Sequence, residues 1–203
     1  RAWQARLRGE HDNLRAALAW LTRADPPTGL RLAGTLYMFW WFHGYLSEGR
    51  AACEALLAHP ANAAPTRERA RALSCAGLMT AWQGDYPAAE RFHAEALALW
   101  RDLPDQRGAA LSHLTLGVMA VYQGEYARGQ AVLEEGLALA RRVGDLPFAA
   151  MSLDSLGLIA ARLDEPDVAA ERWEESARLA EAIGDKGTFA HTLINLAGLY
   201  LHG

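Results

Sequence analysis

Several residue patterns that define common protein classes are scarce or missing in this sequence. Of its 203 residues only Cys53 and Cys75 are cysteines. They form no Cys-x-x-Cys pair and no disulfide framework, so we expect two small buried hydrophobic side chains in a reducing, cytoplasmic setting. The formal net charge of −4 and the pI near 6.0 lack the basic excess that nucleic-acid binding requires, so no direct nucleic-acid contact is expected. No apolar run approaches the roughly 20 residues of a membrane span, and no membrane contact is expected.

Catalytic and metal-binding signatures are also missing. The sequence contains no GxxxxGK, GxGxxG, GxSxG or HExxH motif. Glu90 and His93 make a single ExxH pair, whereas di-iron bundles use two such pairs. Ser112 and His113 are adjacent on an expected helix, so they point to different faces, and no acid is placed beside them. We therefore expect no enzyme activity, no cofactor and no metal.

What the sequence does contain is a repeat of fixed period, in which equivalent positions differ by 40 in number. The segment QGDYPAAE at 83–90 returns as QGEYARGQ at 123–130, with related segments at 43–50 and 163–170. Small residues recur in register, which permits the close approach of two helices. One such column is Gly77, Gly117, Gly157 and Ala197. A second is Gly49, Ala89, Gly129 and Ala169, and a third is Ala96, Gly136 and Ser176.

Between the recurring turns the apolar spacing is helical. Leu111, Leu114, Val118 and Val121 follow an i, i+3, i+7, i+10 course. Glycine followed by aspartate marks the end of one helix and the N-cap of the next, so 83–90 is predicted to be the turn of a helix hairpin. Aspartates at one phase, Asp25, Asp105, Asp145 and Asp185, are predicted N-caps, and prolines at 26, 87, 147 and 166 fall in first turns. The expected helices are 2–23, 27–43, 45–58, 66–83, 86–102, 106–123, 126–143, 146–163, 166–183 and 186–202, with a flexible connector at 58–66.

Helix pairs with Leu-Gly in the first helix, Gly-Asp-Tyr at the turn and Ala in the second resemble the tetratricopeptide repeat. The resemblance covers residues 25–203, although the period is longer than the one typical of that family. It implies an all-α fold, a right-handed superhelical solenoid of antiparallel helix hairpins. Residues 1–24 are expected to form a leading helix that follows an upstream module. The expected repeats are 25–64, 65–104, 105–144, 145–184 and a half-repeat at 185–203.

The segments EHDNLRAALAWL at 10–21 and GLRLAGTLYMFWWFHGYLSEGR at 29–50 carry a second resemblance. They look like the junction in large bacterial transcriptional regulators, of LuxR type or AfsR type, where a signalling ATPase module passes into a tetratricopeptide region. The chain begins at Arg1 and is expected to be part of a longer polypeptide. The resemblance implies a sensor or regulatory arm that binds a protein or peptide, with the ATPase module of its own polypeptide as one candidate partner. A free-standing scaffold for an extended peptide and a receptor for a small-molecule or sugar effector remain open.

The candidate binding surface is a column of aromatic residues near the ends of the first helices. In the resembled fold the first helices line the concave surface, and aromatic faces there can stack on a ligand. Packing against the neighbouring hairpin is the competing interpretation. The segment YMFWWF at 37–42 is apolar around its whole helix, which predicts burial on every side, in a core, a subunit contact or a docked module. The predicted surface comprises Met38, Trp41, Phe42, Leu78, Trp82, Val118, Tyr122, Asp154, Leu158 and Arg162.

Overall fold

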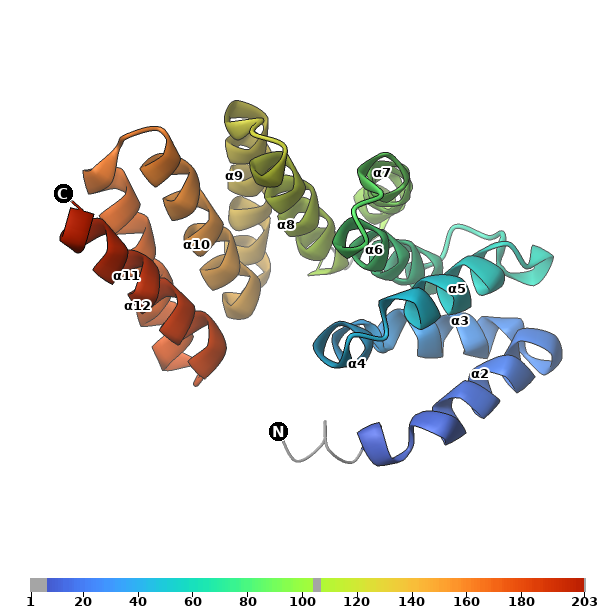
Figure 1. The fold of residues 1–203 in the computed structure, drawn as a ribbon. Helices are drawn as coiled ribbons and strands as arrows, with labels where there is room; N and C mark the ends of the chain where they lie inside the picture. The colour runs from blue at the N-terminus through green and yellow to red at the C-terminus, as the bar shows by residue number, and fades with distance from the viewer. Residues whose placement is uncertain (1–6, 104–106, 203) are drawn as a thin grey trace. The chain divides into compact units, whose positions relative to one another are not determined.

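The chain folds as an all-α array of helix hairpins. The computed structural model describes residues 7–103 and 107–202, and within these ranges it contains helices and turns but no strand (Figure 1). The predicted all-α solenoid is therefore confirmed. The chain divides into two compact units, the first ending at Gly108 and the second beginning at Ala109. Each unit is described by itself.

The first unit is organised around two helices, α3 and α6. Helix α3 packs against α2, α5 and α6, while α6 also packs against α5 and α7. A short helix, α4, touches α5 and α6 (Figure 1). The elements are α2 (His11–Ala24), α3 (Pro26–Thr35), α4 (Tyr37–His43), α5 (Leu46–Leu57), η1 (Pro60–Asn62), α6 (Arg67–Trp82) and α7 (Tyr86–Asp102).

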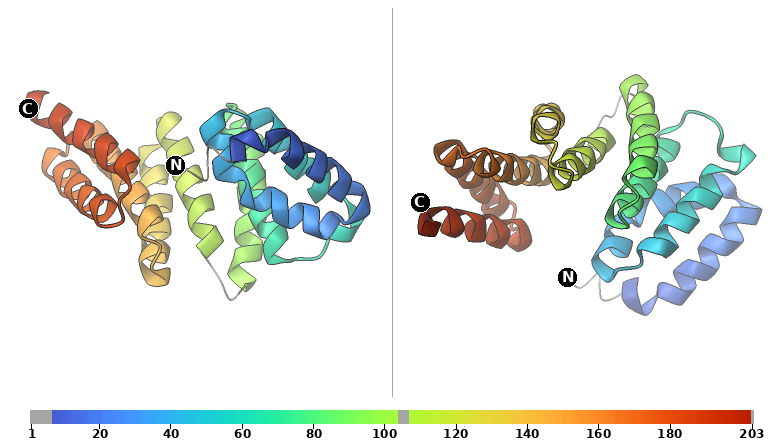
Figure 2. Two further views of the ribbon diagram at one scale, coloured as in Figure 1. Left: turned by 90° about the horizontal axis from the view of Figure 1, so that it is seen from below. Right: turned by 45° about the horizontal axis from the view of Figure 1, so that its top comes forward.

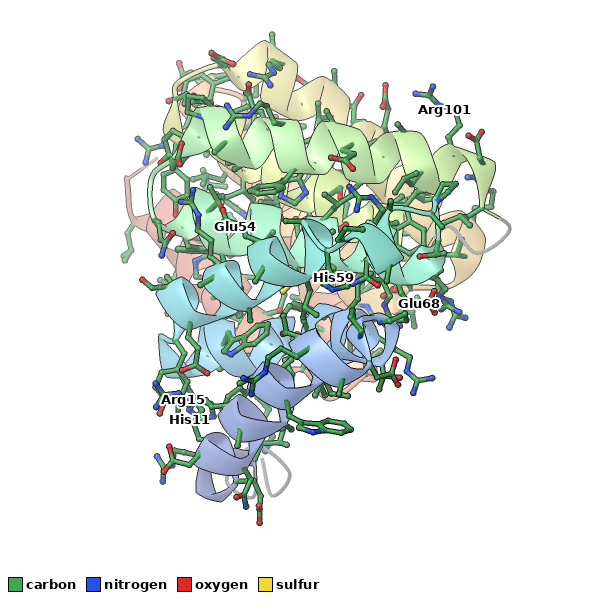
Figure 3. All side chains as sticks on the ribbon, turned by 90° about the vertical axis from the view of Figure 1, so that its right-hand side faces the viewer. His11, Arg15, Glu54, His59, Glu68 and Arg101 are labelled. Carbon is green, nitrogen blue, oxygen red and sulfur yellow. The ribbon has the colours of Figure 1, made fainter. Side chains whose placement is uncertain are left out.

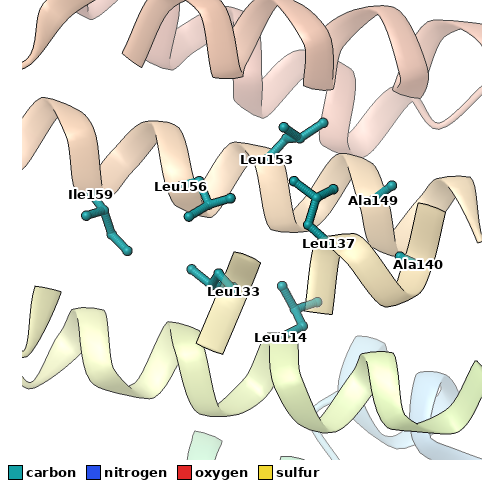
Figure 4. Close-up of a cluster of buried hydrophobic side chains, with 8 residues drawn as sticks. All are labelled: Leu114, Leu133, Leu137, Ala140, Ala149, Leu153, Leu156 and Ile159. Atoms are coloured by element: carbon teal, nitrogen blue, oxygen red, sulfur yellow. The ribbon is translucent and has the colours of Figure 1, made fainter. Parts of the chain in front are cut away.

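The second unit stacks its helices in chain order. Its elements are α8 (Arg107–Tyr122, of which the first two residues belong to the first unit), α9 (Tyr126–Val143), α10 (Leu146–Arg162), α11 (Pro166–Ala182) and α12 (Lys186–His202). Helix α10 packs against α9, α11 and α12, and α11 also packs against α12 (Figure 2). Leucines of α8, α9 and α10 form a buried cluster between them (Figure 4).

The turns between paired helices repeat with the predicted period. Helices α5, α7, α9 and α11 begin at residues 46, 86, 126 and 166, which are evenly spaced by that period. The preceding glycines Gly44, Gly84 and Gly124 have φ of 74°, 81° and 77°, the left-handed region that glycine adopts without steric cost. At the fourth turn Asp164 takes this conformation, with φ of 62°. The hairpin assigned to QGDYPAAE is therefore confirmed.

Aspartate side chains cap the helices as the sequence predicts. Asp85 Oδ1 accepts a hydrogen bond from the Ala88 amide at 3.3 Å, and Asp145 Oδ1 accepts one from the Phe148 amide at 3.4 Å. Asp25 and Asp185 make the equivalent bonds at the start of α3 and α12. Each bond satisfies one backbone donor that the first helical turn leaves without a partner. The predicted cap at Asp105 lies outside the described residues.

The glycine column marks the closest helix contacts within the hairpins. A Cβ atom on Gly117 would lie 2.4 Å from Leu133 Cγ, so only glycine leaves room for that leucine. Gly77 accommodates His93, and Gly157 accommodates Trp173, in the same way. In these three hairpins the first helix supplies the space and the second helix supplies the bulky side chain.

The first hairpin reverses this arrangement. Tyr37 stands at the glycine position, and the small Cys53 stands where the other hairpins carry the bulky residue. The bulk comes instead from Trp40 on the first-helix side, which is buried against Gly49 of α5, where a Cβ would lie 2.6 Å from the indole. Close packing is therefore preserved although the large and small partners have changed sides.

Two predicted helices are interrupted. The single helix expected over 27–43 is wrong, because the chain breaks at Leu36 into α3 and α4. On one side of the break Gly34 lies close to the backbone of Ala72 in α6, and on the other Trp40 covers Gly49. The helix expected over 2–23 has a turn at Glu10, and its residues before 7 lie outside the described ranges. The expected connector at 58–66 contains η1, where the buried Asn62 side chain donates to the carbonyls of Pro26 and Leu56.

Candidate binding surface

The predicted aromatic column is accessible in the structure. Phe42, Trp82 and Tyr122 are 52%, 48% and 68% exposed, although each ring is large and apolar. Arg162, the fourth member, is also exposed. These residues lie in the last turns of α4, α6, α8 and α10. The column therefore contributes to the surface of each unit rather than to its interior.

The neighbouring columns belong largely to the interior. Leu78 is buried. Val118 packs against the leucine cluster of Figure 4, and Leu158 packs against a second cluster around Trp173. Met38 is half-buried on α4. Of the predicted contact residues, this inner set has the least side-chain surface to offer a partner.

Three of the predicted residues come together in the first unit. The Trp41 and Phe42 rings are 4.9 Å apart between centroids, and the Trp41 and Trp82 rings are 5.8 Å apart, at interplanar angles of 52° and 49°. We call Trp41, Phe42 and Trp82 the aromatic patch. Its rings come from two helices, α4 and α6, between which the chain also forms α5 and η1. Burial on every side, as expected for YMFWWF, is not reached within this chain, because Phe39 and Trp40 are buried while Phe42 is open.

A polar network fixes the backbone next to the aromatic patch. Gln83, which follows Trp82, donates from Nε2 to Ser47 Oγ at 2.9 Å and accepts from Arg50 at 3.2 Å. The Arg50 guanidinium also binds Glu54 at 2.9 Å and Asp85 at 3.1 Å. These bonds, first that to Glu54, raise the pKa of Arg50 above its usual value, so this side chain stays charged. The Arg50 network (Ser47, Arg50, Glu54, Gln83 and Asp85) holds the turn after α6 against α5.

A second cluster ties α2 to α5. His11 Nε2 lies 2.9 and 3.0 Å from the two carboxylate oxygens of Glu48, and its ring stacks on Tyr45 at 4.0 Å. Arg15 reaches the same carboxylate at 3.4 Å, and Figure 3 shows His11 and Arg15 on one side of α2. Phe39 of α4 meets His11 edge-on at 5.5 Å. The helix that carries Trp41 and Phe42 is therefore anchored on its buried side.

In the second unit, Asp154 is the centre of a network that the sequence did not indicate. Its carboxylate lies 2.9 Å from His191 Nδ1 and accepts from Thr192 at 3.1 Å and Asn195 at 3.2 Å. The Asp154 carbonyl accepts from the Trp173 indole at 3.0 Å. Asp154 thus joins α10 to α11 and α12, and its hydrogen-bonding capacity is largely used within the fold. The partners lie 37, 38 and 41 residues further along the chain, so a comparison of positions one period apart does not pair them.

Other candidate reactive groups are buried. His93 of the ExxH pair is enclosed beneath Gly77, and among residues 7–103 and 107–201 no group of three His, Cys, Asp or Glu side chains could hold a metal ion. Cys53 and Cys75 are free and fully buried. A hydrogen bond with Cys53 and burial raise the pKa of the Cys75 thiol well above its usual value, which makes it a poor nucleophile. A pocket of about 220 Å³ lies away from the aromatic patch, lined by residues of α3, η1 and α6 that include Leu30, Arg31 and Asn62.

The hydropathy of the helices gives one further result. Within the part of the chain that the structure describes, no helix combines the length and the apolar character needed to cross a bilayer.

Comparisons with known proteins agree with this repeat geometry. A sequence model of the tetratricopeptide repeat family matches residues 68–142, which hold α7, α8 and most of α6 and α9. Residues 68–142 of this chain are therefore similar to tetratricopeptide repeats. A search of curated protein sequences gave no significant match.

Solved structures share the fold at low sequence identity. BtubC (BKLC) from P. vanneervenii matches with a TM-score of 0.71 and 18% identity over 91% of this chain and 77% of its own. RapI in its apo form matches with a TM-score of 0.68 and 14% identity, over 84% of this chain but 49% of RapI. PilW, a widely conserved type IV pilus biogenesis factor, matches with a TM-score of 0.62 and 14% identity, over 97% of this chain and 90% of PilW. These likenesses establish a common helical-repeat architecture and nothing about ligands.

Proposed function

We propose that this chain is a non-catalytic module that binds an extended segment of a protein, with the aromatic patch at the centre of the contact. The observation that carries the proposal is the meeting of three large aromatic side chains from two separate helices, two of them about half exposed. Helical-repeat proteins commonly bind partners along surfaces built by successive repeats. Clustered exposed aromatic residues mark interaction sites more often than scattered ones.

The neighbourhood of the aromatic patch supports this assignment. Binding is stronger when the contact residues are already ordered, because less conformational freedom is lost on association. Here the Arg50 network fixes the chain immediately after Trp82, and the His11 cluster anchors α4. The rings are thus presented on a backbone that is held from both sides.

A peptide-selection experiment tests the proposal. Peptides selected from a random library on the purified chain would be measured against the parent and the variants Trp82→Ala and Trp41→Ala. We expect either variant to weaken binding by about 1–3 kcal/mol, the range for stacking on an aromatic platform, while Trp82→Ala melts close to the parent. Trp20→Ala is the matched control, because Trp20 on α2 is 60% exposed and makes no ring contact with the described residues.

Two results would contradict the proposal. Selected peptides that bind Trp82→Ala and Trp41→Ala as tightly as the parent would remove the aromatic patch from the contact. A Trp82→Ala variant that melts far below the parent while binding normally would assign the ring to packing, since truncating a buried aromatic costs about 3–5 kcal/mol.

For the wider context, we propose that the module is the sensor or regulatory arm of a multidomain transcriptional regulator. The support is the resemblance of residues 10–50 to the junction between a signalling ATPase module and a tetratricopeptide region. The partner would then be that ATPase module, held inactive until an effector binds. The full open reading frame tests this context: an upstream Walker A motif is expected, and a frame without one would leave a free-standing adaptor.

A further inference from the structure

We infer that the aromatic patch recognises a cationic side chain, an arginine or a lysine of the bound segment. This inference rests on the proposed function and names the chemistry of its ligand. Three features of the first unit support it: the indole faces, the helix end that carries one of them, and the charges beside it.

The indole rings provide the first feature. The Trp41 and Trp82 ring centroids lie 5.8 Å apart and the ring planes are tilted by 49°, so the two rings contact each other without stacking in parallel. Tryptophan has the strongest attraction for a cation among aromatic side chains, and arginine is the most frequent partner. An aliphatic stem passing over Phe42 would add apolar contact while its charged end meets the indoles.

The position of Trp82 provides the second feature. It is the last residue of α6, a helix of 16 residues. The carbonyl groups at a helix C-terminus carry a partial negative charge that favours a nearby cation. At this end of α6 the amides of Gln83, Gly84 and Asp85 already bond the carbonyls of Met79, Thr80 and Ala81, so the partial negative charge left for a ligand is that of the last carbonyl, Trp82.

The Arg50 network provides the third feature. One guanidinium lies between two carboxylates, those of Glu54 and Asp85, so the network carries an excess negative charge. The side chains of these acids are 41% and 42% exposed, whereas that of Arg50 is 25% exposed. Figure 3 shows Glu54 on α5. The network that Gln83 joins, directly after Trp82 in the chain, therefore carries a net negative charge.

Together these features select among partner segments. An aliphatic or acidic segment could use the apolar surface but not the helix end or the carboxylates. A basic side chain uses all three. The structure thus assigns to the aromatic patch a basic residue flanked by apolar contacts, not a terminal carboxylate.

Isosteric probes test the inference. N-acetyl-arginine amide and the neutral N-acetyl-citrulline amide would be titrated into the intact chain, with the indole N–H signals of Trp41 and Trp82 followed by NMR and assigned with the two alanine variants. We expect both signals to shift with the arginine probe, which should bind about three- to tenfold more tightly than citrulline. The Trp20 signal should not move.

A charge variant sharpens the test. Glu54→Gln removes one carboxylate of the Arg50 network. It should lower the affinity for the arginine probe about two- to threefold and leave the affinity for the citrulline probe unchanged. Glu95→Gln is the matched control: it breaks the ion pair of Glu95 with Arg69, which lies near the opposite end of α6 from Trp82. Trp82→Phe keeps an aromatic face and should retain part of the preference for arginine.

The outcomes separate the inference from the proposed function. Equal affinities for arginine and citrulline, or no shift with either probe, overturn the cationic ligand. If library-selected peptides still lose affinity in Trp82→Ala, the binding module itself stands. If those peptides bind Trp82→Ala and Trp41→Ala as tightly as the parent, the proposed function fails together with the inference.

Discussion

The first hairpin and the three that follow solve one packing problem in opposite ways. In the later hairpins the first helix carries glycine and the second carries His93, Leu133 or Trp173. In the first hairpin Trp40 on the first-helix side fills the space over Gly49 of α5. What the period conserves is the pairing of one large side chain with one small one, because tightly packed interiors tolerate neither a void nor an overlap.

The exchange also changes which surface is open. The break at Leu36 separates α3 from α4, so the aromatic segment turns Phe39 and Trp40 inward while Phe42 stays exposed. The later first helices continue without a break to their last residues, and α6 and α8 there expose Trp82 and Tyr122. Within the described residues, the aromatic rings of successive first helices meet in the first unit, where Trp41 contacts Trp82.

The largest expected loss of stability comes from disrupting the reversed pair of the first hairpin, Trp40 and Gly49. Trp40→Ala removes a ring that is 1% exposed and should destabilise the chain by about 3–5 kcal/mol, measured by urea unfolding. Trp20→Ala, at an exposed site, should change stability by less than about 0.5 kcal/mol. A small effect of Trp40→Ala would show that the first hairpin does not depend on the exchanged pair.

The regular pair predicts the next largest effect. Gly117→Leu should cost roughly 1–3 kcal/mol, because the new side chain overlaps Leu133 at the helix contact. Thermal melts that match the parent would remove the close-packed column from this description. In the double variant Gly117→Ala with Leu133→Ala the two changes should cost less than the sum of the single variants, since the added methyl group enters the space that the leucine vacates.

The turns predict effects of about 1 kcal/mol. Gly124→Ala places a Cβ in the left-handed region and should cost about 1–2 kcal/mol. Asp164→Gly removes the Cβ from the same left-handed conformation at the fourth turn and should raise the free energy of unfolding by up to about 1 kcal/mol. Denaturation midpoints measured side by side check the opposite signs, and equal signs would mean that the turns are not equivalent.

The smallest expected effect depends on pH. Burial lowers the pKa of His113 below its usual value near 6.5, against weaker opposing effects of Glu135 and the Val132 backbone. The unfolded chain therefore binds a proton at this residue before the folded chain does, so stability should fall as pH drops from about 6.5 towards the lowered pKa. His113→Gln should show a smaller fall over this range in matched melts. Identical slopes would contradict the assignment.

Most of the fold could be predicted because its signals are local. Gly84 with Asp85 specifies a turn and a cap within a few residues, and the recurrence at 124 and 125 makes a chance match improbable. The break at Leu36 has no such signal. Neither glycine nor proline occupies that position, and the break lies between two tertiary contacts, that of Gly34 with α6 and that of Trp40 with α5. The exchange of large and small residues in the first hairpin is not visible in the repeat alignment. The alignment compares residues at equivalent positions, whereas the exchange concerns two residues that pack against each other from different positions.

The candidate site was predicted less completely. Phe42 and Trp82 were found from their shared phase, but the same reasoning placed Leu78 on the binding surface, although it is buried. Neighbouring positions on a helix point in different directions, so one can be exposed while the next is buried. The repeat period shows which positions are equivalent in successive hairpins but not which of them face the solvent. Whether the accessible rings bind a partner stays a prediction.

The shared left-handed geometry at Gly124 and Asp164 makes residues 125–164 an interchangeable cassette. Excising it would join Gly124 to Glu165, so α8 would be followed by α11 through a turn of unchanged shape, and Gly117 would receive Trp173 in place of Leu133. Gly117 and Gly157 already face a bulky partner, so the new pairing repeats one that the chain uses. A repeat protein with such joints can lengthen or shorten by recombination between its own copies. Here the shortened chain would also lose Asp154 and its bonds to α11 and α12, so the new neighbours of α11 and α12 would have to replace them.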